Sequence, residues 1–535
     1  MEEKTWTKHY DSRVPQNLTF PDGTLYDIFQ NITERFAEKT AAVFLDGIST
    51  YRELINWTDA FAEAIAAQGI KKGDRIIISL PSSPQFIVAY FALMKLGCIA
   101  VMLNPLSPER EIFFKIKDSG AKGIIGFDMF YDSFSTVIQK TDLELIIFTG
   151  VFDLHPLYSP ENILQLDPGV LNMRNMIDQG GPKIEPVDIS PDEPAVIIYT
   201  GGTTGEPKGV LQSHFNHIAN AWTMTTWGKM NEDDIGMVVL PLFHGFGMAV
   251  MNCLMIRGGS LVLVPKFDIE DMLKQFDKHH ATIMVGVPTM YTAVNNFPEK
   301  EKYNLSSLRV AMSGGAPLSL SIKKEFEAFT GCTLIEGLGL TESTCAVCAS
   351  PCEGLYKEGS VGIPMSNTLM GIKDLETGDK WLETGESGEI VIKSPTVMME
   401  YYKNPEATSE TIRDGWLYTG DIGKVDKDGY FFILDRKKEM IIASGFNVYP
   451  SEVENILQSH PDVLETAVIG VPDEYRGETV KAYIVPKSGT SLTEEQIIEY
   501  CRKNMQKYMV PKIIRFCDNL PKSPIGKILK RELKD

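Results

Sequence analysis

The residues that most clearly suggest chemistry form one stretch, Tyr199-Thr200-Gly201-Gly202-Thr203-Thr204-Gly205-Glu206-Pro207-Lys208-Gly209. A loop rich in glycine exposes many backbone N–H groups, and with threonine hydroxyls and a lysine ammonium beside them it suits a polyphosphate. The stretch is not a Walker loop, because that motif needs Gly-Lys-Ser/Thr in direct succession. A flexible surface loop would explain the glycines but not the threonines and the lysine. The stretch therefore predicts a phosphate-binding loop.

Four later stretches carry groups that could act together with this loop. Ser313-Gly314-Gly315-Ala316-Pro317 is a glycine-rich turn on which a flat ring could rest, and Tyr418-Thr419-Gly420-Asp421 supplies an acid that could accept hydrogen bonds from a ribose. In Glu336-Gly337-Leu338-Gly339-Leu340-Thr341-Glu342 a carboxylate follows closely spaced glycines. A carboxylate near polyphosphate is unfavourable unless a divalent cation lies between them, so Glu342 is a candidate Mg²⁺ ligand. The alternative for Glu342 is an ordinary carboxylate at a helix N-terminus. Pro521-Lys522-Ser523-Pro524-Ile525-Gly526-Lys527 places a lysine after a turn.

Alternating apolar patterns predict α/β layers around these stretches. Ala195–Ile198 is expected to be a buried strand before the phosphate loop, and Val210 to about Trp222 a helix after it. In residues 25–150, Tyr51–Ala67 is typical of a helix and Arg75–Leu80 of a strand. From about Asp153 to Pro194 the chain is rich in Pro, Asp and Gly, which predicts a long surface connection. Further strands are expected at Ser260–Val264, Thr282–Val287, Leu308–Met312 and Thr333–Ile335.

Late in the chain a hairpin signal precedes a change of organisation. Asp426-Lys427-Asp428-Gly429 between Gly423–Val425 and Tyr430–Leu434 predicts a β-hairpin. Beyond Asp435, capping boxes at Ser451/Glu454 and Thr493/Gln496 predict helix starts. Strand-like runs lie between them at Thr466–Val471 and Val480–Val485. This arrangement predicts a compact α+β domain of ordinary size.

Bulk properties limit the partners. The 535-residue chain has a formal charge of −19, which argues against nucleic acid as a main partner. Eight scattered cysteines indicate reduced thiols and a cytoplasmic location, and Met1–Trp6 has no signal-peptide core. Phe86 to Leu103 is almost continuously apolar, but Lys95 and Gly97 interrupt it. A helix to about Leu96 followed by a strand from Cys98 explains this pattern better than a membrane span.

Taken together and in this order, the stretches resemble the AMP-forming acyl-CoA synthetases, a family of adenylate-forming ligases. The resemblance runs from about residue 25 to 531. Its most specific pieces are Tyr199–Gly209, Tyr418–Asp421, Asp435-Arg436-Lys437-Lys438-Glu439-Met440-Ile441 and Pro521–Lys527. The family implies a large N-terminal adenylation domain (residues 1–437) of layered α/β subdomains with a small β-barrel-like part. It also implies a small, mobile α+β lid (residues 438–535) with its hinge at Lys438.

The family's reaction has two halves, which use ATP, Mg²⁺ and coenzyme A. A carboxylate attacks the α-phosphate of ATP to give an acyl-adenylate and pyrophosphate, and then the coenzyme A thiol displaces AMP. The resemblance implies that Lys527, on the lid, bridges the carboxylate and the α-phosphate, and that His244 gates the approach of the thiol. A packed core histidine is the alternative for His244. Thr204 and Glu342 would lie beside the metal.

The remaining site residues also follow from the resemblance. The implied ATP-binding residues are Thr200, Gly201, Gly202, Thr203, Thr204, Gly205 and Lys208 at the β- and γ-phosphates; Gly315, Ala316, Glu336, Gly337, Leu338 and Gly339 around the adenine; Thr341 at the α-phosphate; Asp421 and Arg436 at the ribose; and Lys527. The implied coenzyme A-binding residues are Lys438, Ser444, Gly445 and Phe446. Two positions depart from the family pattern: Gly201 replaces a frequent serine, and Leu338 replaces a usual aromatic residue.

The surroundings of His244 predict an apolar carboxylic acid as substrate. The expected lining residues are Phe246, Met248, Val250, Val285, Met290 and Val347, with Gly245 and Gly247 leaving space. No aspartate stands beside His244 to pair with an amino-acid ammonium. A medium- to long-chain fatty acid is favoured, and an aromatic or alicyclic acid is the alternative. Acyl transfer to a carrier protein and a non-catalytic sensor are the other hypotheses. Cys345, Cys348 and Cys352 lack the second pair of metal-ligating residues that a typical zinc site has, and we expect them to line or flank the acyl pocket.

Overall fold

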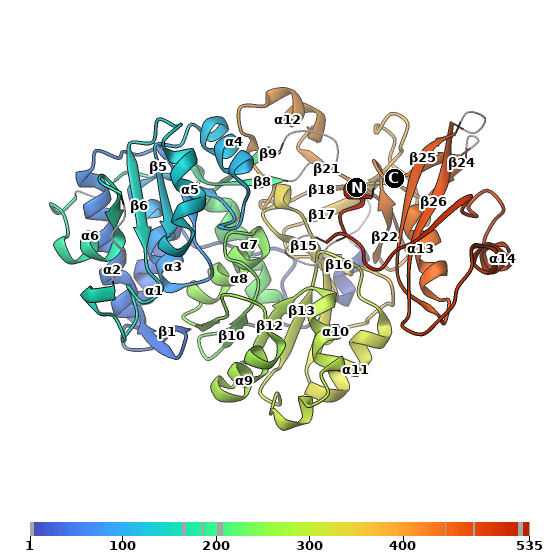
Figure 1. The fold of residues 1–535 in the computed structure, drawn as a ribbon, viewed down its shortest axis with the longest axis horizontal. Helices are drawn as coiled ribbons and strands as arrows, with labels where there is room; N and C mark the ends of the chain where they lie inside the picture. Colours follow the sequence, from blue (N-terminus) through green and yellow to red (C-terminus); the bar gives the residue numbers. More distant parts are fainter. Residues whose placement is uncertain are drawn as a thin grey trace.

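A computed structural model of the chain describes residues 5–162, 167–184, 187–200, 207–443, 446–473, 477–522 and 528–533. Figure 1 shows α/β layers in two neighbouring parts, a smaller β-rich part beside them, and a separate C-terminal part drawn in orange and red. The expected α/β class, with a large N-terminal domain and a smaller C-terminal one, is confirmed.

The first sheet carries the predicted phosphate loop and is parallel except at one end. Its order is β19-β9-β8-β4-β3-β5-β6-β7, with β8–β9 and β9–β19 antiparallel. The strands are β3 (Arg75–Ser79), β4 (Ile99–Met102), β5 (Gly123–Phe127), β6 (Leu145–Thr149), β7 (Leu171–Asn172), β8 (Pro194–Thr200), β9 (Lys208–Ser213) and β19 (Glu400–Tyr401). The helices of this part are α1 (Leu25–Arg35), α2 (Tyr51–Ala67), α3 (Pro84–Leu96), α4 (Glu109–Ser119), α5 (Tyr131–Ile138) and α6 (Met173–Gln179).

The second sheet carries the other predicted nucleotide-binding turns. Its order is β16-β15-β14-β13-β12-β10-β11-β1-β2, parallel from β14 to β1. The strands are β1 (Thr40–Phe44), β2 (Gly47–Thr50), β10 (Ile235–Val238), β11 (Ser260–Leu263), β12 (Ile283–Gly286), β13 (Val310–Ser313), β14 (Thr333–Gly339), β15 (Ala346–Ala349) and β16 (Ile363–Pro364). The helices are α7 (His214–Trp227), α8 (Gly245–Met255), α9 (Ile269–His279), α10 (Pro288–Asn296) and α11 (Leu320–Thr330).

Two further sheets complete the fold. The half-barrel sheet contains β17 (Leu369–Lys373), β18 (Gly388–Lys393), β20 (Ile412–Arg413), β21 (Trp416–Val425) and β22 (Phe431–Arg436). The helix α12 (Pro405–Thr411) precedes β20 in the chain and contacts β19, β20 and β21. The C-terminal sheet contains β23 (Ile441–Ala443), β24 (Phe446–Val448), β25 (Val463–Asp473), β26 (Gly477–Pro486) and β27 (Ile513–Phe516), with helices α13 (Pro450–Gln458) and α14 (Glu494–Asn504). Its hydrophobic core consists of buried apolar side chains between Ile441 and Ile514, with partly buried side chains such as Leu492 and Phe516 packed against them.

The apolar run after Ser83 folds as its pattern predicts. It forms α3, which ends at Gly97 in the left-handed conformation, and the chain then enters β4. A helix that is hydrophobic on all sides is a core helix, and almost every residue of α3 is buried. Lys95 reaches Asp59 with 2.8 Å between nitrogen and oxygen. Within the described residues, no helix combines the length and apolar character that a bilayer crossing requires.

The segment after the phosphate loop departs from our prediction. Residues 208–213 form β9, antiparallel to β8, so the loop closes a β-hairpin and does not lead directly into a helix. The helix begins only at His214, where Ser213 and Asn216 form a capping box. Apolar residues at 210 and 211 satisfy a helical period as well as a strand, and pairing with β8 and β19 decides between them. The expected surface connection before β8 likewise contains the short elements β7 and α6.

The two predicted capping boxes near the C-terminus have different outcomes. Thr493 and Gln496 cap α14 as expected. The box at Ser451 and Glu454 is wrong, because α13 starts at Pro450 and Ser451 lies inside its first turn. The Ser451 backbone N–H donates to the Asp435 carboxylate at 2.8 Å, so an acid from β22 serves the helix start instead. Glu454 accepts from the Val468 backbone N–H at 2.6 Å. The predicted hairpin between β21 and β22 is confirmed.

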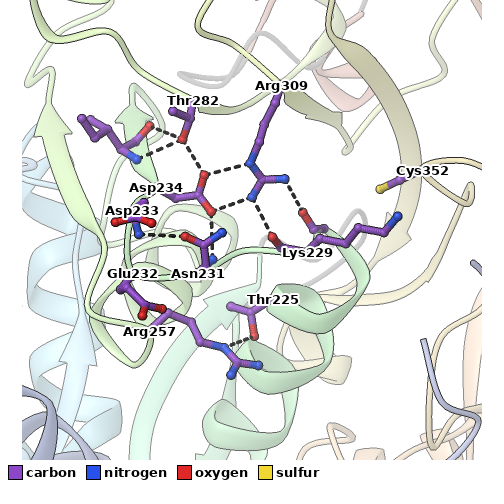
Figure 2. Close-up of polar contacts among 12 residues, drawn as sticks. Thr225, Lys229, Asn231, Glu232, Asp233, Asp234, Arg257, Thr282, Arg309 and Cys352 are labelled. Carbon is purple, nitrogen blue, oxygen red and sulfur yellow. Dashed lines mark hydrogen bonds and ion pairs between the residues drawn. The ribbon is translucent and has the colours of Figure 1, made fainter. Parts of the chain in front are cut away.

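A polar network joins the amino-terminal ends of three strands of the second sheet (Figure 2). This end is opposite to the one that carries the predicted nucleotide-binding turns. Arg309, just before β13, contacts both carboxylate oxygens of Asp234, just before β10, at 2.5 and 2.9 Å. Arg309 also donates to the carbonyls of residues 228 and 229, and the Thr282 hydroxyl donates to Asp234 at 2.6 Å. Since residues 234, 282 and 309 enter three adjacent parallel strands, the network holds their amino ends in register. Arg257 packs on the Trp222 ring nearby, 3.8 Å from its centre.

Candidate adenylation site

The predicted phosphate loop joins β8 to β9. Thr200 ends the first strand, Lys208 starts the second, and the two residues are paired across the hairpin. Thr200 Oγ1 donates to the Lys208 carbonyl at 3.4 Å. The predicted ligands Gly201, Gly202, Thr203, Thr204 and Gly205 lie outside the described residues. The ammonium of Lys208 lies 4.8 Å from the centre of the Tyr401 ring.

Thr341 and Glu342 lie in a short 3-10 turn after β14, and neighbouring segments hold its backbone. The Gln212 side chain donates to the Thr341 carbonyl at 2.7 Å, and the Met398 N–H donates to the Glu342 carbonyl at 2.8 Å. Because Gln212 belongs to β9, the turn is fastened to the strand that follows the phosphate loop. Glu342 is the acidic residue of this three-residue 3-10 helix, and no α-helix begins there.

Glu342 fits a magnesium site that is shared with a bound phosphate. Its Oε1 accepts a hydrogen bond from the Tyr401 hydroxyl at 2.8 Å, and across the described chain it makes no ion pair. The described residues contain no cluster of three or more metal-ligating side chains. Mg²⁺ is commonly held by one or two carboxylates together with substrate phosphates and water, so a single half-buried carboxylate beside a phosphate loop matches that chemistry.

The two glycine-rich turns lie side by side, since β13 and β14 are neighbours. Gly315, with φ of 79°, and Ala316 are exposed at the turn after β13. Position 339 requires a glycine because the neighbouring backbone is too close for a side chain: a Cβ there would lie 2.4 Å from the Cys345 carbonyl oxygen. Gly337 pairs with Ala349 across β14 and β15. The exposed backbone of the first turn is the surface on which a flat ring could rest.

Glu336 and Leu338 point into the protein in this structure. Glu336 Oε1 accepts from the Leu318 N–H at 3.1 Å, and its Oε2 is buried without a hydrogen-bond partner among the described residues. Burial raises the pKa of Glu336 to about 7. Leu338 is 7% exposed and packs in the core beneath the half-barrel sheet. Both side chains therefore support the turns, and the ring-facing surface is mainly backbone.

The predicted ribose-binding pair comes together. Asp421 on β21 and Arg436 on β22 are register partners, with 2.5 Å between Arg436 Nε and Asp421 Oδ1. Asp421 is buried, whereas Arg436 is exposed. The next residue, Lys437, is fixed by a 2.8 Å ion pair with Glu389 on β18. The arrangement offers one acid and one cation at a single edge of the half-barrel.

His244 lies at the N-cap of α8. Its Nδ1 accepts from the Phe246 N–H at 3.3 Å, which leaves the proton of a neutral ring on Nε2. Burial lowers the pKa of His244, so the ring is neutral near pH 7. Gly245 lies beside the carbonyl of Thr344, and the Phe246 ring packs beside Gly314. The start of α8, the Glu342 turn and the turn after β13 therefore meet.

The predicted acyl-pocket residues fall into two groups. Met248, Val250, Val285 and Met290 belong to the main core, with Phe246 packed against it, whereas Val347 lies in the core beneath the half-barrel. Gly247 does not leave space for a substrate, because a Cβ there would lie 2.2 Å from the Pro241 carbonyl oxygen. Cys345 lies in the main core and Cys348 under the half-barrel, and Cys352 Sγ donates to the Trp227 carbonyl at 3.4 Å. The three thiols therefore face different surroundings.

The lid residues are only partly described. Lys438 is exposed two residues after the end of β22, and the Phe446 backbone pairs with Ala443. Ser444, Gly445 and Lys527 lie outside the described residues. The segment that contains Lys527 is flanked by Lys522 and Ile528, which form an antiparallel bridge. Lys522 pairs with Glu465 on β25 at 2.5 Å, so the flanks belong to the C-terminal sheet.

Sequence reasoning missed two residues that organise this region. Tyr401 contacts both Glu342 and Lys208. Asp435 contacts the start of α13 across the predicted hinge. The only sequence signal for Tyr401 is a Tyr-Tyr pair before Asn404-Pro405, which by itself indicates no site. Asp435 begins the motif Asp435–Ile441, which by itself assigns this residue no contact with a helix.

Comparisons with known proteins place this geometry in context. Residues 29–402 match the family model described as AMP-binding enzyme, and residues 452–527 match AMP-binding enzyme C-terminal domain. The chain is 37% identical to a long-chain-fatty-acid–CoA ligase of Bacillus subtilis over 99% of this chain and 98% of the relative. ATP-bound MatB from Rhodopseudomonas palustris is 30% identical, with a TM-score of 0.85 over 95% of this chain and 98% of that one. The anthranilate CoA ligase AuaEII with anthranoyl-AMP is 27% identical, also with a TM-score of 0.85, over 96% of this chain and 97% of its own.

Proposed function

This chain belongs to the AMP-binding enzyme family, and from that premise we propose that it activates a medium- to long-chain fatty acid with ATP and transfers the acyl group to coenzyme A. Its reaction class is that of an AMP-forming carboxylate–CoA ligase. The observation that carries the proposed substrate is the whole-length similarity to a ligase named for long-chain fatty acids. Met248 and Val250, which follow His244 on α8, are buried apolar residues of the main core, and a fatty-acid substrate would need apolar surroundings of this kind.

The first half-reaction needs positioning and charge neutralisation. A carboxylate oxygen attacks the α-phosphorus, and the bond from that phosphorus to pyrophosphate breaks. We assign the β- and γ-phosphates to the loop from Thr200 to Lys208, the α-phosphate to Thr341, and the ribose to Asp421 and Arg436. Mg²⁺, held by Glu342 and Thr204, would neutralise phosphate charge. Lys527 would offset the repulsion between the two reacting anions.

In the second half-reaction the coenzyme A thiol attacks the acyl carbon and the bond to AMP breaks. We assign the entry of the thiol to the surface formed by Lys438, Ser444, Gly445 and Phe446 after the lid turns about Lys438. His244 is neutral, so it gates the path by its shape and its Nε2 donor without adding charge. We also propose a cytoplasmic location, where ATP, coenzyme A and reduced thiols are available. All eight cysteines are free thiols.

A panel of acids tests the substrate. AMP formation is measured with acetate, octanoate, dodecanoate, hexadecanoate and 4-coumarate, each with coenzyme A or with a holo-acyl carrier protein. Each buried CH₂ contributes about 0.8 kcal/mol, so we expect kcat/KM to rise about two- to fourfold per methylene until the pocket is filled. Best activity with acetate or 4-coumarate would contradict the fatty-acid assignment. Preference for the carrier protein would contradict transfer to coenzyme A.

A further inference from the structure

Two oppositely charged groups of the candidate site contact the same tyrosine. The Lys208 ammonium lies against the face of the Tyr401 ring, and Glu342 accepts a hydrogen bond from its hydroxyl. Although both are described, Lys208 and Glu342 do not form an ion pair with each other. The ring therefore stands between a cation and an anion that would attract each other strongly if they met in a partly buried place.

Backbone pairing fixes the position of Tyr401. It pairs with Val210 where β19 joins β9, and the next N–H along the chain, that of Tyr402, donates to the Gly209 carbonyl at 2.7 Å. Three residues before Tyr401, the Met398 N–H donates to the Glu342 carbonyl. One short segment thus binds both the strand that follows the phosphate loop and the turn that carries Glu342. Tyr401 is 6% exposed, so its ring has little freedom.

We propose that Tyr401 is a positioning residue that keeps Lys208 and Glu342 apart, so that the ammonium is available for phosphate and the carboxylate for Mg²⁺. This inference rests on the function proposed above. The hydroxyl occupies Oε1 of Glu342 and thereby fixes the plane of the carboxylate, which leaves Oε2 for the cation. The ring face holds the ammonium through a cation–π contact, which neutralises it less than a carboxylate would.

Two variants separate the two contacts. Tyr401→Phe removes the hydroxyl and keeps the ring, whereas Tyr401→Leu removes both. Tyr402→Phe is the matched control, because its hydroxyl donates to the Ser119 carbonyl at 3.2 Å and does not reach Glu342. ATP affinity is measured by calorimetry on the full chain with Mg²⁺ and with EDTA, without acid or coenzyme A. This readout is independent of turnover.

We expect Tyr401→Phe to weaken ATP binding in Mg²⁺ about tenfold, the scale of one hydrogen bond to a charged group, and to leave binding in EDTA within about twofold. Tyr401→Leu should weaken binding in both conditions, because Lys208 is then free to pair with Glu342. Tyr402→Phe should match the wild type. Wild-type affinity for Tyr401→Phe, or equal losses with and without Mg²⁺, would overturn the proposal.

A double variant keeps the test decisive if packing is disturbed. If Tyr401 acts through Glu342, Tyr401→Phe combined with Glu342→Gln should bind ATP in Mg²⁺ as Glu342→Gln alone does, within about twofold. Additive losses would show a general packing effect and refute the role. A wild-type protein that binds ATP but activates no acid would refute the proposed function while leaving this positioning role supported by its own readout.

Discussion

Replacing Glu336 with glutamine should change how the stability of the large domain depends on pH. Glu336 is buried below the turn after β13, and burial raises the pKa of its carboxyl from 4.5 to about 7. The folded protein therefore keeps a proton that the unfolded chain releases near pH 4.5. This group contributes stability below pH 4.5, and the contribution is lost as the pH rises towards about 7. Glutamine has no such proton, and its carbonyl can still accept from the Leu318 N–H.

The size of the effect follows from the pKa. A carboxyl whose pKa moves from 4.5 to about 7 corresponds to roughly 3 kcal/mol of unfolding free energy between the two ends of that range. Glu336→Gln should therefore gain stability relative to the wild type by up to about 3 kcal/mol between pH 4.5 and 8. Most of that gain should be complete by pH 7. Other titrating groups are common to both proteins and cancel in the difference.

The measurement is urea unfolding of both proteins at half-unit steps from pH 4.5 to 8. The exposed Glu358 on a nearby loop provides the control, because Glu358→Gln should give a difference that stays within about 0.5 kcal/mol at every pH. If the difference for Glu336→Gln is equally constant across the range, the carboxyl is ionised in the folded protein and the burial argument is wrong.

Two further predictions concern the Asp234–Arg309 ion pair and the lid. Asp234→Ala should lower the unfolding free energy by about 3 kcal/mol, because it leaves Arg309 without its buried partner. The control Asp46→Ala removes a pair with Lys278 that is exposed on both sides, and should lower it by less than about 1 kcal/mol. Equal losses for the two variants in urea unfolding would refute a stabilising role of the Asp234–Arg309 pair. Lys527→Ala should slow ATP–pyrophosphate exchange about 100- to 1000-fold while sparing thioester formation from supplied acyl-adenylate. The control Lys522→Ala should keep both rates within about twofold of the wild type. Near wild-type exchange in Lys527→Ala would show that this lysine takes no part in the first half-reaction.

Local sequence determined the elements with strong periodic or turn signals. α2 runs from Tyr51 to Ala67 as predicted, α3 ends at Gly97, and the hairpin between β21 and β22 forms around Asp426–Gly429. These elements are set by neighbours within a few residues, so the chain itself carries their signals. The reaction class likewise followed from the order of short motifs, and the family match confirms it.

Contacts between distant segments decided the rest. The start of α7 could not be placed from sequence, because residues 208–213 suit helix and strand alike until β8 and β19 pair with them. Gly247 was interpreted as space for a substrate, but the backbone at Pro241 occupies that place. Asp435 replaces Ser451 at the start of α13 because the fold brings β22 to that helix.

The sequence alone predicted a phosphate-binding loop, a carboxylate suited to a cation and lysines suited to neutralising charge, because residue type determines those capacities. Only the tertiary structure decided how the groups are kept from neutralising one another. Lys208 and Glu342 are 134 positions apart, and Tyr401 lies a further 59 along the chain. Their arrangement depends on the pairing of β9 with β19, and no local pattern encodes a contact that forms only when distant strands meet.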